Sequence, residues 1–249
     1  MMRFLLGLLL IIAFLGFFLF MTPLSFLLKV GNVSSTGLTW SNAYGTIFTG
    51  GLDDVRYGPQ PIGDVSLSIK PRELLKARLQ YELKITRGIG DIEGSLFIGS
   101  DQVGLRAIDA SIDVSELVGL KQEIRDLGGV VDVRADEIIF RGGECDAASG
   151  RLETDTLVRA AETYGRNMSP MKGIFECDGP MLHIPMSATS EEGDRVDARL
   201  RLGLAERSTA EAQVRTDDAQ LGLVLLALGF STADGAYHYR RDRMIEVGL

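Results

Sequence analysis

The sequence predicts an α+β, β-rich protein in which a single N-terminal transmembrane helix precedes a mostly antiparallel, curved β-sheet domain with short helices between strands. Three observations predict this class: a long apolar run at the start of the chain, alternation of apolar and polar residues through most of the rest, and short segments that carry helix-start signals. We place the membrane anchor at residues 1–28 and one periplasmic β-rich domain at residues 29–249.

The apolar run extends from Phe4 to Phe20, through Leu10 and Phe14, without a charged side chain, and Met21–Leu28 prolongs it. A helix needs about 20 apolar residues to cross a bilayer, with a lower limit of about 17. A cleaved signal peptide is the alternative, but its apolar region is shorter, about 7–15 residues. The run therefore favours an uncleaved anchor.

Basic residues beside the span set its orientation. Arg3 flanks one side, and Lys29 stands alone on the other. The very short N-terminal tail with Arg3 favours a cytoplasmic N-terminus. We therefore expect a single-pass protein of the cell inner membrane with a periplasmic C-terminal domain.

The charge balance argues against one class of partner. The chain of 249 residues has 26 Lys and Arg against 34 Asp and Glu, a formal net charge of −8. Nucleic-acid binding relies on clustered Lys and Arg. We expect no nucleic-acid partner.

Period-2 alternation predicts strands with one apolar and one wet face, which is typical of antiparallel sheets. The apolar members of four such strands are Val65, Leu67 and Ile69; Leu79, Tyr81, Leu83 and Ile85; Ile108, Ala110, Ile112 and Val114; and Val196, Ala198, Leu200 and Leu202. We expect these side chains on the inner face of the sheet.

Four short helices are predicted where Pro, Ser, Thr or Asp precedes an apolar pair. They begin near Pro71, in Val114–Leu127, near Leu157 and in Gln220–Leu228. Four strand–helix–strand units suggest a diverged internal repeat; alternatively, such helices are simply common in α+β proteins. The helices Val114–Leu127 and Gln220–Leu228 are candidates to cover the apolar face, and part of the second is alternatively a partner surface.

Cys145 and Cys177 are the only cysteines. An even count in an exported domain favours a disulfide, because the compartment is oxidising. The two cysteines are 32 positions apart. Closing a loop of this length stabilises a fold by roughly 3–4 kcal/mol on the chain-entropy estimate.

No catalytic or metal-binding pattern occurs. His183 is predicted to point outward from a strand, and His238 lies in the last hairpin. The sequence has no Gly-x-Ser-x-Gly elbow and no His/Cys cluster with ligand spacing. Gly88–Gly94 and Asp53–Asp54 are predicted turns, Asp217–Asp218 a helix start, and Glu191–Asp194 a hairpin tip. We expect no enzyme activity, cofactor, metal or small-molecule substrate.

Two local patterns follow the apolar run. The first consists of Gly45, Thr46, Phe48 and Gly50, and the second of Gly63, a short strand, and then Pro71, Leu74 and Leu75. They resemble the type II secretion system protein N family, also called general secretion pathway protein N, which shows Gly-Thr-aliphatic-Trp-x-Gly soon after a single anchor and then a glycine, a short strand, Pro-x-x-Leu-Leu and another strand. The end of the chain, from Leu221 to Tyr237, resembles the family's closing Leu-rich helix and hairpin. Phe48 and Leu67 stand where the family often has tryptophan.

The resemblance implies a non-enzymatic accessory or assembly component of the type II machinery, which exports folded proteins across the outer membrane. It implies partners among the other secretion components, either the inner-membrane platform or the outer-membrane secretin. The alternative is an envelope lipid carrier, in which the one-sided strands form an apolar half-open trough.

An assembly component binds through sheet edges or apolar patches, because an edge leaves backbone N–H and C=O groups unpaired. We expect contacts at the glycine-rich Tyr44–Gly51 segment and at the final Tyr237–Val247 hairpin. Ordinary pairing within the domain is the alternative for both.

Overall fold

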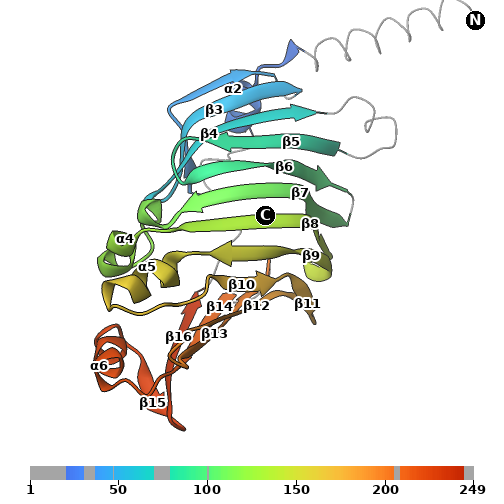
Figure 1. The fold of residues 1–249 in the computed structure, drawn as a ribbon. Helices are drawn as coiled ribbons and strands as arrows, with labels where there is room; N and C mark the ends of the chain where they lie inside the picture. The colour runs from blue at the N-terminus through green and yellow to red at the C-terminus, as the bar shows by residue number, and fades with distance from the viewer. Residues whose placement is uncertain are drawn as a thin grey trace, which may run out of the picture.

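The computed structural model describes residues 21–30, 37–46, 48–69, 79–99, 101–204 and 208–243. These residues form one sheet of 16 strands (Figure 1). Strands that are consecutive in the chain are mostly neighbours, and β16 lies between β14 and β15 near the C-terminal edge. Every pairing is antiparallel. The predicted β-rich antiparallel class is therefore confirmed.

The first half of the chain contains these elements: α2 Leu24–Val30, β1 Leu38–Thr39, β2 Asn42–Gly45, β3 Thr49–Tyr57, β4 Gln60–Ile69, β5 Leu79–Thr86, β6 Gly90–Ile98, β7 Gln102–Asp113, the 3-10 helix η2 Val114–Glu116, and α4 Gln122–Leu127. The second half contains these: β8 Val130–Arg141, β9 Glu144–Thr154, α5 Thr156–Thr163, β10 Met171–Ile174, β11 Glu176–Asp178, β12 Met181–Thr189, β13 Arg195–Leu202, β14 Ser208–Arg215, α6 Ala219–Ala227, β15 Ser231–Ala233, and β16 Ala236–Arg243.

The predicted alternation holds across neighbouring strands. Side chains that stand opposite each other on paired strands share a face of the sheet. One such row joins five strands with apolar residues only: Val65, Ile85, Ile92, Ala110 and Val133. The adjacent row is polar: Ser66, Lys84, Glu93, Asp109 and Arg134. We call the apolar side the inner face and the polar side the outer face.

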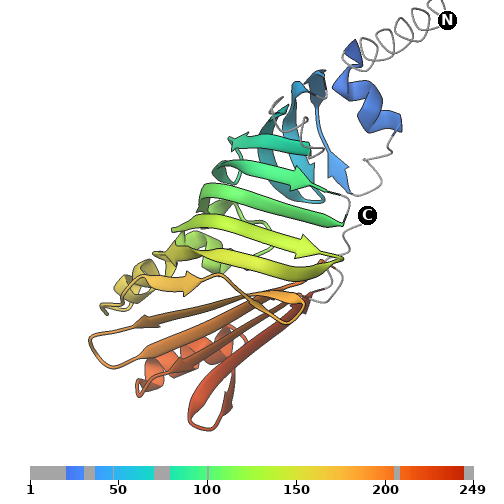
Figure 2. The same ribbon diagram turned by 90° about the vertical axis from the view of Figure 1, so that its right-hand side faces the viewer.

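The sheet folds over so that the inner faces of two regions pack against each other. Ile138 and Phe140 of β8 contact the cluster that contains Leu182 and Ile184 of β12 and Phe175. Figure 2 shows the sheet as a continuous twisted ladder from the N-terminal to the C-terminal strands. The core thus comes from one sheet closing on its own apolar side.

Helices α4, α5 and α6 gather at one end of the strands (Figure 1). Leu221 and Leu225 of α6 pack against Val196 and Val214, so this helix does cover the inner face, as predicted. By contrast, α4 has no buried residue. The expectation that Val114–Leu127 covers the inner face as a helix is therefore wrong.

That segment is two short pieces rather than one helix. Asp113 caps η2 by accepting a hydrogen bond from the Ser115 N–H at 2.9 Å. Leu117 then takes an extended conformation (φ −82°, ψ 92°), and α4 begins only at Gln122. The residues between them form long-range contacts that a continuous helix would not allow.

Asp53–Asp54 is wrongly predicted as a turn, because both residues lie inside β3. The pairing of β3 with β4 shifts between Leu52 and Val55. Asp54 has a positive φ of 51°, and its N–H donates to the Asp64 carboxylate at 2.9 Å. The two acids therefore form a β-bulge, in which an Asp tolerates the left-handed conformation better than most residues.

Several predictions lie outside the described residues: the Phe4–Phe20 span, and Pro71, Leu74 and Leu75 with their helix. Within the described part of the chain, no helix has the length and apolar character needed to cross a bilayer. Leu24 and Leu28 of α2 lie in the stretch that prolongs the apolar run, and they pack on Leu52 and Val55 of the sheet.

Candidate functional site: the folded sheet and its edges

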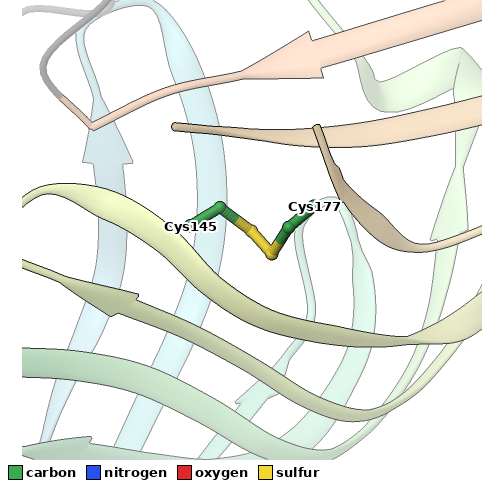
Figure 3. Close-up of a disulfide and its surroundings, with 2 residues drawn as sticks. All are labelled: Cys145 and Cys177. Carbon is green, nitrogen blue, oxygen red and sulfur yellow. A yellow bond between two sulfur atoms is a disulfide. The ribbon is translucent and has the colours of Figure 1, made fainter. Parts of the chain in front are cut away.

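The structure joins Cys145 to Cys177, the disulfide that the sequence predicts (Figure 3). Their Cα atoms are 5.6 Å apart. Cys145 lies at the start of β9, and Cys177 lies in β11, which pairs with β12. The bond therefore fastens the two inner faces together near the core.

The bond lies where the strand ladder is interrupted. β10 pairs with β9 only from Arg151 to Thr154, and β11 pairs with β12. Beside the first part of β9, the Cys145 N–H donates to the Pro180 carbonyl at 2.9 Å. The disulfide thus connects β9 to β11 where the hydrogen bonds between β9 and β10 end. We call this region, from β9 to β12, the crease of the sheet.

The glycines of the first sequence pattern form the β2–β3 hairpin. Gly45 pairs with Gly50, and the Thr46 N–H donates to the Thr49 carbonyl at 2.9 Å. Gly45 has a φ of +76°, and a Cβ there would lie 2.3 Å from the Thr49 carbonyl oxygen. Only glycine fits this position, so the pattern marks a tight turn. Phe48 lies beside this turn, and its carbonyl accepts from the Ile69 N–H at 2.7 Å.

Gly63 has a comparable role one strand later. Its φ is +115°, and an added Cβ would lie 1.7 Å from the Arg87 carbonyl oxygen. The close approach of β4 to the turn after β5 therefore requires a glycine. The glycines Gly45 and Gly63 of the two patterns thus have a structural cause, whereas Pro71, Leu74 and Leu75 lie outside the described residues.

The segment Leu117–Lys121 lies between the two halves of the sheet. On one side, the Gln60 side chain donates to the Glu116 carbonyl and accepts from the Val118 N–H, both at 2.9 Å. On the other side, Lys121 Nζ donates to the Leu228 carbonyl at 2.8 Å. These contacts join β4 to the end of α6 through one loop.

A cavity of about 330 Å³ adjoins this loop. Its apolar lining comes from both the loop and the second half of the sheet, namely Leu117, Leu120, Leu200, Leu202 and Ala210. The inner face is therefore not completely filled at this end. The sequence did not indicate the loop's position, because its partners are more than 50 residues away.

The inner face of the first half is only partly covered. Outside the three buried clusters lie half-buried side chains of β5 and β6: Tyr81, Leu83, Ile85, Ile92 and Leu96. Burial raises the pKa of the Tyr81 phenol. Of the described helices, α2 packs at the outermost strands of this half, where Leu24 contacts Leu52. Half-buried apolar side chains therefore line the inner face along β5 and β6.

Arg166 links three segments at the helical end. Its guanidinium contacts the carboxylates of Asp194, in the β12–β13 hairpin, and Asp218. Asp218 also caps α6 by accepting from the N–H groups of Gln220 and Leu221. Those backbone bonds, with Arg166, lower the pKa of Asp218. The structure thus confirms Asp217–Asp218 as a helix start and Glu191–Asp194 as the tip of a hairpin. The Asp194 side chain is nevertheless only 4% exposed.

The two histidines have structural surroundings. His183 points away from the inner face, as predicted, but its side chain is only 13% exposed because Glu176 of β11 lies beside it. Its Nδ1 is 2.9 Å from a Glu176 carboxylate oxygen. His238 lies in the last hairpin, with Nε2 3.3 Å from the Ala233 carbonyl. In the described ranges, no three His, Cys, Asp or Glu residues group as a metal site.

The two edges of the sheet differ in chemistry. At the N-terminal edge, β2 presents Asn42–Gly45, and Tyr44 is exposed. At the other edge, β15 covers only Ala236–His238 of β16. The remainder of β16, Tyr239–Arg243, pairs with β14 on one side. On its other side no further strand lies among the described residues, and this part of β16 is rich in charged residues. Charged edges discourage strand addition.

The fold defines a class of protein: a single antiparallel sheet, folded on its apolar side and fastened by a disulfide. A sequence model of the family "Type II secretion system (T2SS), protein N" matches residues 36–240. The chain belongs to this family, and the family belongs to the type II secretion machinery. No curated protein and no solved structure matches the chain.

Proposed function

We propose that this protein is a non-enzymatic accessory component of type II secretion, anchored in the inner membrane by Phe4–Phe20 with its sheet domain in the periplasm. The observation that supports this most is the family match, which extends over residues 36–240. The apolar run and the Cys145–Cys177 bond agree with an exported, membrane-attached domain.

In this role the domain binds other secretion components through its sheet. The N-terminal edge is the better candidate for strand addition, because β2 is short and uncharged. The final hairpin, the second contact region predicted from sequence, instead offers Arg240, Arg241 and Asp242, so polar side-chain contacts suit it better. The expected partners are the inner-membrane platform or the outer-membrane secretin.

Gene deletion tests the proposal. Folded exoproteins are expected to accumulate in the periplasm or to be released more slowly, while membrane lipid composition stays unchanged. Complementation with the full chain should restore release. A chain whose residues 1–28 are replaced by a cleaved signal sequence should restore less, because it lacks the anchor. Unchanged secretion and no crosslink from the domain to any secretion component would contradict the proposal.

A second candidate is an envelope lipid carrier, and the half-covered inner face along β5 and β6 favours it. Acyl chains are expected to lie against Leu83, Ile85 and Ile92. Mass spectrometry of the purified full chain tests this candidate. Stoichiometric lipid that disappears in Ile92→Glu, together with normal secretion in the deletion strain, would favour the carrier over the secretion component.

A further inference from the structure

The short strand β10 lies between β9 and β12 (Figure 1). A groove of about 550 Å³ crosses the outer face of the sheet at this strand. Residues from β9, β10, β12 and β13 line it, among them Arg151, Lys172, Ile174, Pro185, Arg195 and Arg199.

Two of its arginines have no anionic partner within the described part of the chain. Arg151 stands directly opposite Arg134, and Asp109, the next residue in the same row, is paired with Arg134 at 3.5 Å. Arg199 stands opposite Glu211, which is paired with Arg240 at 2.9 Å. Like charges opposite each other on paired strands are unfavourable. An anion bound at Arg151 would therefore relieve its repulsion by Arg134.

The acidic residues in the groove are also paired. Glu153 lies 3.7 Å from Lys172, and Asp197 lies 2.8 Å from Arg195. After these pairings the groove retains the two charges of Arg151 and Arg199. A local positive charge on a chain of net charge −8 fits an anionic ligand.

An exposed apolar strip separates the two arginines. Ile174 is opposite Arg151 on β9 and is 58% exposed, and Pro185 is opposite Arg199. The two arginines are three strand spacings apart, about 14 Å at 4.8 Å each. In an extended peptide, side chains at i, i+2 and i+4 point the same way and span about 13 Å.

We propose that this groove binds an extended acidic segment of a partner protein with the pattern acid-x-apolar-x-acid. The two carboxylates pair with Arg151 and Arg199, and the central apolar side chain packs on Ile174 and Pro185. Arginine suits this role because its planar guanidinium binds a carboxylate through two parallel N–H groups. A peptide is favoured over a membrane surface because its carboxylates at i and i+4 match the spacing of the two arginines. The inference goes beyond the proposed function and does not depend on it.

Fluorescence anisotropy with a labelled peptide containing Glu-Thr-Leu-Thr-Glu tests the proposal on the full chain in neutral detergent. We expect saturable binding that weakens as salt rises. Arg151→Glu/Arg199→Glu should weaken it about tenfold, since both attractive charge pairs become repulsive. The matched control Arg56→Glu/Arg215→Glu makes the same charge change at exposed positions outside the groove and should bind as the wild type does.

Arg151→Gln/Arg199→Gln provides a neutral variant with the same expected loss if the charge reversal disturbs folding, which thermal unfolding monitors. A peptide of the same composition with adjacent glutamates should bind less tightly. Equal binding by the wild type and both groove variants would overturn the proposal. Absence of peptide binding, together with arginine-dependent binding to vesicles of anionic lipid, would also overturn it and assign the groove to the membrane.

Discussion

The two halves of this sheet have the same alternating sequence pattern but differ in how the inner face is covered. In the second half, α6 and the disulfide-linked strands bury Val196, Val214 and Ile184. In the first half, Leu83, Ile85 and Ile92 remain half-buried. Alternation thus determines which side chains share a face, whereas burial depends on what packs over them. Among the described residues, the inner face along β5 and β6 is therefore less completely covered than the inner face of the second half.

The largest expected effect is in the second half. Ile184→Asp places an unpaired charge at a residue that is 3% exposed, and it should lower the free energy of unfolding by more than about 4 kcal/mol. Urea unfolding followed by circular dichroism measures this. Ser187→Asp, at an exposed position of the same strand, is the control and should have little effect. A small loss for Ile184→Asp would show that the second half is not tightly packed.

Removal of the disulfide should have the next largest effect. Cys145→Ser/Cys177→Ser is expected to lower the free energy of unfolding by about 3–4 kcal/mol, because the bond closes a loop with a sequence separation of 32. Wild-type protein in dithiothreitol should unfold at the same urea concentration as the variant. An unchanged midpoint in both would mean that the crease is held without the bond.

In the first half the same kind of substitution should matter less. Leu83→Asp is expected to lower the free energy of unfolding by about 1–2 kcal/mol, since much of the introduced charge reaches water. Glu82→Lys, on the outer face of the same strand, should be nearly neutral. Equal tolerance at both positions would show that the register of β5 is misassigned.

The smallest effect concerns acid at the helical end. Hydrogen bonds from Gln220 and Leu221, with Arg166, lower the pKa of Asp218. Burial acts to raise the pKa of Asp155, but the Val130 N–H and Arg159 outweigh it and lower that pKa. A lowered pKa in the folded state adds stability above the unfolded value of about 3.9, and this is lost as pH falls through the folded value.

The melting temperature should therefore fall as the pH drops below about 4. Asp218→Asn should melt lower at pH 7 and show a weaker acid dependence, whereas Asp217→Asn, at the exposed neighbour, should behave as the wild type does. Identical pH profiles for Asp218→Asn and the wild type would show that this cap does not contribute to acid sensitivity.

Much of the fold was predictable because its signals are local. Alternation identified β4, β5, β7 and β13, and the helix-start signals identified α5 and α6. The disulfide followed from an even cysteine count in an exported domain. The family patterns were also local, since Gly45 and Gly63 are required by backbone geometry within single hairpins.

The remaining features depend on contacts between distant residues. Leu117, Leu120, Ile124 and Leu127 have helical spacing, yet the chain breaks there because Gln60 and Leu228 bond the intervening loop. Arg166 was missed because its partners lie 28 and 52 residues away. The four strand–helix–strand units are not equivalent either, because β4 ends at Ile69, at the opposite end of the sheet from Asp113.

Cysteine labelling tests the contrast between the two halves most directly. Ile92→Cys and Val214→Cys place one thiol on the inner face of each half, in chains that keep the native disulfide, and exposed Ser187→Cys gives the rate for an open position. A hydrophilic maleimide should modify Ile92→Cys more slowly than Ser187→Cys but much faster than Val214→Cys, which should stay largely unmodified. If Ile92→Cys were as protected as Val214→Cys, the inner face along β5 and β6 would be covered as well, and the contrast between the two halves would be contradicted.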